Sequence, residues 1–178
     1  MIRQLVCSWL LLGVLCAWTS VKPDPYGLQS IVDSMEYPGV VTKVKWVDCW
    51  QVNAFYDPRA MEVQLCNELK PLPKLVIQGF LAHELAHGVI FQRGIPYTGS
   101  EEFAADELAF LVLHLSGRDD VLRALADFYA NSARPEHPRD PHPSDNRRVF
   151  MAQEMSYGLD SNYYRRVLWA WATLLEKF

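Results

Sequence analysis

The pentapeptide His83–His87, with sequence HELAH, constrains this chain more than any other feature. The surrounding stretch from Gly79 to Phe91 favours a helix, and residues four apart on a helix project from the same face. Both imidazoles can therefore reach one metal ion, and a pair of neutral imidazoles is typical of a zinc site. Glu84 follows the first histidine directly, so we expect it beside that ion, where it can take a proton from water. This HExxH pattern is typical of a metallopeptidase helix and predicts one bound Zn²⁺ ion.

A catalytic zinc site with two histidines needs a third protein ligand and an open position for water. Glu102 and Asp106 lie four residues apart in the next helix-forming segment, so they share a helical face. We expect Glu102 to bind the metal and Asp106 to accept the free ring N–H of His83 or His87. Two alternatives stay open. The carboxylates form a solvated acidic face at a helix N-terminus, or Glu101 is the ligand in place of Glu102.

These two patterns together resemble the gluzincin superfamily of zinc peptidases, in which HExxH on one helix is completed by ExxxD on the next. Here the second pattern is Glu102–Asp106, and Gly94, Pro96 and Gly99 supply the turn between the two helices. Such a turn lets the second helix pack back on the first.

Apolar periodicity and turn residues predict an α+β domain that is mostly helical, with a small antiparallel sheet before the HExxH helix. The β-structure consists of one strand and a hairpin, and five helices follow it. The expected elements are a helix over 28–37, a strand over 40–47, hairpin strands over 52–56 and 61–66, and helices over 74–93, 100–116, 119–133, 144–155 and 163–176.

Length and charge limit the domain organisation and the partners. The chain has 178 residues, half of them hydrophobic, and a net charge of −4. This suffices for one domain with its own core, which we assign to 21–178. The mild acidity and the lack of a Lys/Arg cluster argue against nucleic acid or an anionic membrane surface as the main partner. The expected partner is a peptide or protein substrate, and no sequence pattern indicates an oligomeric state.

Residues 1–20 have the pattern of a secretory signal peptide. Arg3 precedes an apolar run, 5–18, which is shorter than the roughly 20 residues needed to span a membrane. We expect cleavage between Ala17 and Ser20 and an exported protein, periplasmic or extracellular. The alternative is an uncleaved segment, 5–18, that anchors the protein in the membrane.

Two cysteines, Cys49 and Cys66, remain after this leader, just outside the expected hairpin. An even pair in an oxidising compartment predicts one disulfide. Two buried free thiols are the alternative. Zinc ligation by the pair is disfavoured because the close C-x-x-C spacing is missing.

From Cys49 to Phe150 the chain resembles a group of small bacterial metallopeptidases related to minigluzincins, which implies a zincin-like fold. The matching segments are Cys49, Asn53–Asp57, Leu65–Leu69, His83–His87, Pro96, Gly99–Asp106 and His142–Arg148.

Two of these segments also imply site residues. Asn53–Tyr56 is similar to the edge strand of thermolysin-type peptidases, which implies that Asn53 and Ala54 hold the substrate backbone. An ordinary hairpin whose asparagine caps a bulge is the alternative. The segment His142–Arg148 is similar to a His-Pro segment of HtpX-like and CAAX-prenyl zinc proteases. That similarity implies that His142 donates to the oxyanion and that Arg148 orients the site or binds a substrate carbonyl. A solvent-exposed loop histidine is the alternative.

These expectations describe a secreted or periplasmic zinc peptidase. His83, His87 and Glu102 hold the ion, and Glu84 takes the proton of the attacking water and later delivers it to the leaving amine. Two other hypotheses stay open. One is a zinc-binding, catalytically silent interaction module of the cell envelope, and the other is a structural envelope protein with a chance motif.

Overall fold

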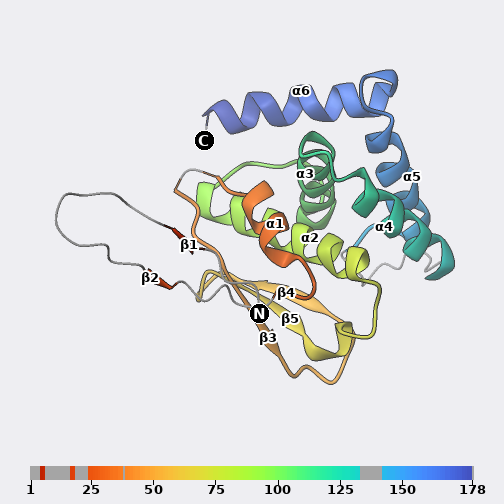
Figure 1. Ribbon diagram of the computed structural model, residues 1–178. Coiled ribbons are helices and arrows are strands. Elements are labelled where there is room, and N and C mark those ends of the chain that lie inside the picture. Colours follow the sequence, from red (N-terminus) through yellow and green to blue (C-terminus); the bar gives the residue numbers. More distant parts are fainter. Residues whose placement is uncertain (1–4, 7–16, 19–23, 38, 133–141, 178) are drawn as a thin grey trace.

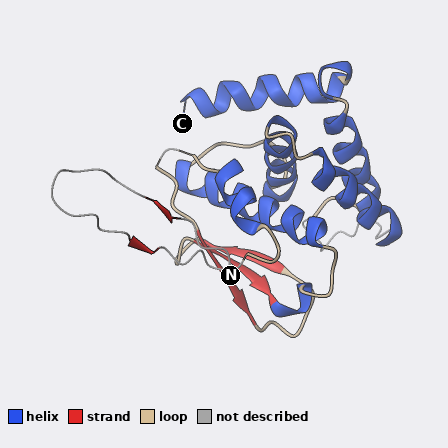
Figure 2. Ribbon diagram, in the orientation of Figure 1, coloured by secondary structure: helices blue, strands red, loops and turns tan. Residues whose placement is uncertain are grey.

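The computed structural model of the protein describes residues 5–6, 17–18, 24–37, 39–132 and 142–177, and these form an α+β fold, as expected (Figures 1 and 2). Helix α2 crosses the middle of the molecule, with a small sheet on one side and most other helices on the other (Figure 1). The elements of the described part are β1 (Leu5–Val6), β2 (Ala17–Trp18), α1 (Leu28–Ser34), β3 (Lys43–Val47), β4 (Ala54–Asp57), β5 (Glu62–Cys66), η1 (Asn67–Leu69), α2 (Lys74–Arg93), α3 (Glu101–Leu115), α4 (Asp119–Ser132), α5 (Asp145–Ser156), η2 (Gly158–Asp160) and α6 (Asn162–Lys177).

Helix α2 carries the HExxH pattern, and every residue from 81 to 90 is buried. It begins after Pro73 and ends at Gly94, whose left-handed backbone (φ 60°) terminates it. A Cβ atom on Gly79 would lie 2.5 Å from the side chain of Leu125 on α4. On its other side, a Cβ on Gly88 would lie 3.1 Å from the ring of Tyr56 on β4. Glycine at these two positions lets α2 approach both neighbours closely, which places the HExxH residues between the helices and the sheet.

The three-stranded sheet has the order β3–β5–β4. Strands β4 and β5 form the expected antiparallel hairpin. The third strand, β3, pairs with β5 in parallel, so the predicted antiparallel pairing holds for the hairpin but not for β3. The reason is that β4 runs opposite to β3, and β5 reverses direction again and lies between β3 and β4. The strand next to β3 therefore runs in the same direction as β3 itself.

The parallel pairing also brings the two cysteines together. Val47 lies opposite Cys66, so the C-terminal ends of β3 and β5 lie side by side. A disulfide joins Cys49 to Cys66 there, as the sequence predicts.

Within the segments described, no helix combines the length and apolar character needed to cross a membrane. The expected leader, 1–20, and the alternative anchor, 5–18, fall largely outside the described residues; the pairs Leu5–Val6 and Ala17–Trp18 form the antiparallel strands β1 and β2.

Candidate active site

Three side chains from α2 and α3 converge on one point. The Nε2 atoms of His83 and His87 lie 3.2 Å apart, and Oε2 of Glu102 lies 3.1 Å from the first and 3.4 Å from the second. Tetrahedral bonds of about 2.0–2.1 Å would space ligand atoms about 3.3–3.4 Å apart. The three atoms thus fit the donor set and spacing of one zinc-sized cation.

The start of α3 sets the position of Glu102. Ser100 caps the helix, because its hydroxyl accepts the backbone N–H of Phe103 at 3.2 Å. The acidic residues Glu101 and Glu102 consequently fall in the first turn, which faces the HExxH helix.

Each imidazole is held by a second carboxylate at its other ring nitrogen. His83 Nδ1 lies 2.8 Å from Asp106 Oδ1, and His87 Nδ1 lies 2.8 Å from Glu101 Oε1. Both Nε2 atoms point toward Glu102, and an ion bound between them would take their lone pairs while the Nδ1–H groups donate to the carboxylates. Asp106 therefore partners His83, one of the two options expected. Glu101 contacts the Nδ1 atom of His87 and not the point where the two Nε2 atoms and Glu102 converge.

The role of Glu101 was missed at the sequence level, although a signal for it exists. Consecutive helical residues point about 100° apart, so two successive acids can contact different ring nitrogens. Tyr97 extends this contact, because its hydroxyl donates to Glu101 Oε2 at 3.2 Å.

Arg148 on α5 completes a buried chain of contacts behind His83. Its Nε donates to Asp106 Oδ2 at 2.8 Å, and its guanidinium lies 5.1 Å from the ring centre of Tyr129. Asp106 is fully buried and Arg148 is only 4% exposed. Burial alone would raise the pKa of Asp106, but the charges of His83 and Arg148 hold it below its usual range. These contacts hold Arg148 against Asp106 and the ring of Tyr129.

Negative charge dominates the convergence point. Burial lowers the pKa of His83, yet Asp106 and Glu102 outweigh it and raise that pKa to about 10. Burial likewise raises the pKa of Glu102, but hydrogen bonds from His142, His83 and His87 hold it far below its usual range. Ionised carboxylates around two imidazoles suit a divalent cation.

Glu84 is 8% exposed and faces the sheet. Burial raises its pKa, against the opposing effect of His83 and His87, and its carboxylate accepts a hydrogen bond from the backbone N–H of Tyr56 on β4. A carboxylate with a raised pKa is suited to take up a proton near neutral pH.

No strand among the described residues pairs with the edge of β4 that faces Glu84. Cys66 N–H donates to the carbonyl of Asn53 at 3.0 Å, so by the alternation of an antiparallel ladder Ala54 and Tyr56 turn their backbone groups away from β5. The contact from Tyr56 N–H to Glu84 agrees with this direction.

A cavity of about 170 Å³ lies between this edge and the helices. It brings four of the predicted site residues, Asn53, Ala54, His142 and Arg148, together with His83 and Glu84. The remaining lining residues are mostly apolar: Val52, Phe80, Phe128, Tyr129 and Ser132.

His142 reaches the convergence point from the segment that precedes α5. Its Nε2 lies 3.0 Å from Glu102 Oε2, and its side chain is 36% exposed. Ligand atoms of His142, His83 and Glu102 all lie within 4.8 Å of one another. His142 thus lies at the point of convergence, next to the Glu102 oxygen that would bind a metal ion.

The helical part of the chain also matches a known family. A family model described as "Putative metallopeptidase" (DUF4344) matches residues 73–177, more than half of the chain. The chain belongs to this family. The matched region of this DUF4344 protein contains α2 to α6, and therefore the HExxH pattern, Glu102, Asp106, His142 and Arg148. Family membership supports a metal-dependent peptidase. No curated protein and no solved structure matches the chain.

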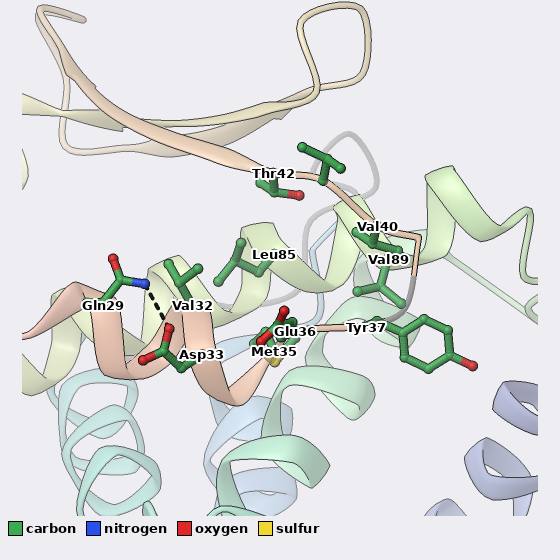
Figure 3. Close-up of a pocket in the computed structure, with 11 residues that line it drawn as sticks. Gln29, Val32, Asp33, Met35, Glu36, Tyr37, Val40, Thr42, Leu85 and Val89 are labelled. Atoms are coloured by element: carbon green, nitrogen blue, oxygen red, sulfur yellow. Dashed lines mark hydrogen bonds between the residues drawn. The ribbon is translucent and has the colours of Figure 1, made fainter. Parts of the chain in front are cut away.

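A second hollow, of about 290 Å³, lies on the opposite side of α2 (Figure 3). Leu85 and Val89 form its floor, each two residues after a histidine and hence about 200° around the helix from it. Asp33 in its rim accepts a hydrogen bond from Gln29 at 2.8 Å. His83, Glu84 and His87 do not line this hollow, so the candidate active site is the cavity beside β4.

Proposed function

We propose that this DUF4344 protein is a zinc-dependent peptidase of the gluzincin type, with His83, His87 and Glu102 as the zinc ligands. The spacing of 3.1–3.4 Å between their donor atoms is the observation that carries the proposal. A zinc ion held there would supply a Lewis acid that lowers the pKa of water and polarises a carbonyl group. Asp106 and Glu101 would keep the imidazoles in the ligating tautomer.

Glu84 is the general base. It takes a proton from the water whose oxygen bonds to the carbonyl carbon of the scissile peptide, and it delivers that proton to the nitrogen when the C–N bond breaks. Its burial and raised pKa support this role, because the carboxylate must hold a proton between the two steps. His142 donates a hydrogen bond to the carbonyl oxygen as negative charge develops on it.

The open edge of β4 binds the substrate backbone. Ala54 offers an N–H and a C=O that β5 leaves unpaired, and Asn53 lines the adjoining cavity. An extended peptide can add to such an edge as another strand. Contact between this edge and Glu84 through Tyr56 supports a substrate path beside the general base.

Export of the protein is part of the same proposal. A disulfide between Cys49 and Cys66 favours an oxidising compartment, in agreement with the expected leader at 1–20.

The test combines metal analysis with cleavage assays. The purified chain should contain one zinc per molecule and should cleave members of a peptide library, and a chelator should abolish cleavage. Glu84→Gln should retain zinc and fold but lose cleavage. Glu36→Gln serves as the matched control, because Glu36 is an exposed carboxylate that lines the hollow beside α1 rather than the cavity beside β4.

Cleavage by Glu84→Gln at the wild-type rate would refute the mechanism. Stoichiometric zinc without cleavage of any peptide would support the silent binding module instead, and absence of zinc would exclude both.

A further inference from the structure

The loop between β3 and β4, residues 48–53, presents a tryptophan to solvent. Trp50 is 93% exposed, and its backbone lies in the left-handed region at φ 62°. Bulky residues rarely adopt this conformation, which asparagine or glycine accepts more readily. The side chain contributes almost no buried area to the fold, so folding alone does not account for tryptophan at this position.

The contacts that hold this loop come from its backbone and its neighbours. The disulfide fixes Cys49 to the end of β5. The carboxylate of Glu68 accepts the backbone N–H groups of Cys49 and Trp50 at 3.4 and 2.8 Å. Asn67 donates to Asp48 at 2.5 Å. The loop is thus anchored to β5 and η1, and it presents Trp50 from a fixed backbone.

The loop leads directly into the active-site edge. Val52 is 59% exposed and lines the cavity that contains Glu84, and Asn53 and Ala54 follow it. Ala54 lies four positions after Trp50 in the sequence, at most about 14 Å of extended chain. A strand added along β4 would therefore pass Val52 and come within reach of Trp50 a few residues from the cleaved bond.

We propose that Trp50 and Val52 form an apolar subsite for a polypeptide substrate, which binds an apolar side chain outside the cleavage point. This inference rests on the proposed peptidase function. A rigid, exposed indole next to an open strand edge can bury a large area with little loss of conformational freedom. The substrate class that follows is an extended polypeptide with an apolar residue near that end of β4, rather than a dipeptide or a short polar peptide.

The kinetic test uses Trp50→Ala and Trp50→Asn, the second because asparagine tolerates the left-handed backbone. Trp169→Ala is the matched control, since Trp169 is also exposed (74%) but lies on α6 rather than in the loop that leads into β4. With the best-cleaved library peptide, both Trp50 variants should raise KM about tenfold or more, with kcat nearly unchanged. Shortening the peptide at the end that reaches the loop should raise the wild-type KM equally and remove the difference between wild type and variants.

A binding measurement separates this subsite from catalysis. In the Glu84→Gln background, titration with the same peptide should shift the tryptophan emission to shorter wavelength, and Trp50→Asn should weaken binding about tenfold or more. Equal KM and equal affinity for wild type and the Trp50 variants would overturn the subsite but leave the peptidase intact. Failure of every peptide to bind or be cleaved would overturn both proposals.

Discussion

Removal of the Asp106 charge tests the buried chain from His83 through Asp106 to Arg148. Asp106 accepts from both neighbours at 2.8 Å, and both neighbours are donors. In Asp106→Asn the amide oxygen can accept from only one side, and its NH₂ group then meets a second donor. The buried guanidinium of Arg148 loses its counter-charge, although its own pKa keeps it protonated.

The expected loss of stability is large for an isosteric change. Removal of one partner of a buried ion pair costs about 3–5 kcal/mol. In a domain of this size each kcal/mol lowers Tm by about 2–4 °C, so we expect a fall of about 6–20 °C. The metal-free protein should show this loss in full, because ion binding stabilises the folded state by mass action.

The assay is urea and thermal unfolding of the chelator-treated protein, with Arg148→Met and the double variant included. Replacing both charges removes the uncompensated cation, so the double variant should be more stable than Asp106→Asn by at least about 1 kcal/mol. Glu101→Gln is the control, since its side chain is 44% exposed and its change in stability should stay below about 1 kcal/mol. An unfolding midpoint for Asp106→Asn equal to that of the wild type would refute the reasoning, as would a double variant no more stable than the single one.

Three further predictions concern the oxyanion donor, the disulfide and the packing of α2. His142→Ala should lower kcat about 10²–10³-fold while zinc content stays at one per chain, and loss of zinc would instead identify it as a ligand. Cys49 and Cys66 enclose a separation of 17 residues, so reduction, or serine at both, should destabilise the fold by about 3 kcal/mol in urea unfolding. Gly79→Ala places a Cβ 2.5 Å from Leu125 and should lower the free energy of unfolding by about 1–3 kcal/mol. An unchanged urea midpoint would show that Leu125 and α4 can shift without cost.

Much of the site follows from local spacing. The HExxH helix, the next helix with its ExxxD pattern and the hairpin before them were all predicted from periodicity and turn residues. The i, i+4 relation that puts His83 and His87 on one face is a property of the helix itself and needs no tertiary partner. The same local rule placed Glu102 and Asp106 together on α3.

Other features required the tertiary structure. The direction of β3 relative to β5 depends on which neighbour the returning hairpin strand selects, and alternation of side chains carries no such information. The partner of Arg148 depends on the approach of α5 to α3, a long-range contact between residues 42 apart. The exposure of Trp50 likewise depends on a loop held by Glu68 and a disulfide rather than on its own composition.

The sequence by itself determined the donor types and their spacing along two helices, because helical geometry converts residue number into direction. Only the tertiary structure decided which carboxylate meets which ring nitrogen, and which strand edge faces Glu84. Those choices depend on how far α2, α3 and β4 approach one another, and close packing at Gly79 and Gly88 sets that distance for α2.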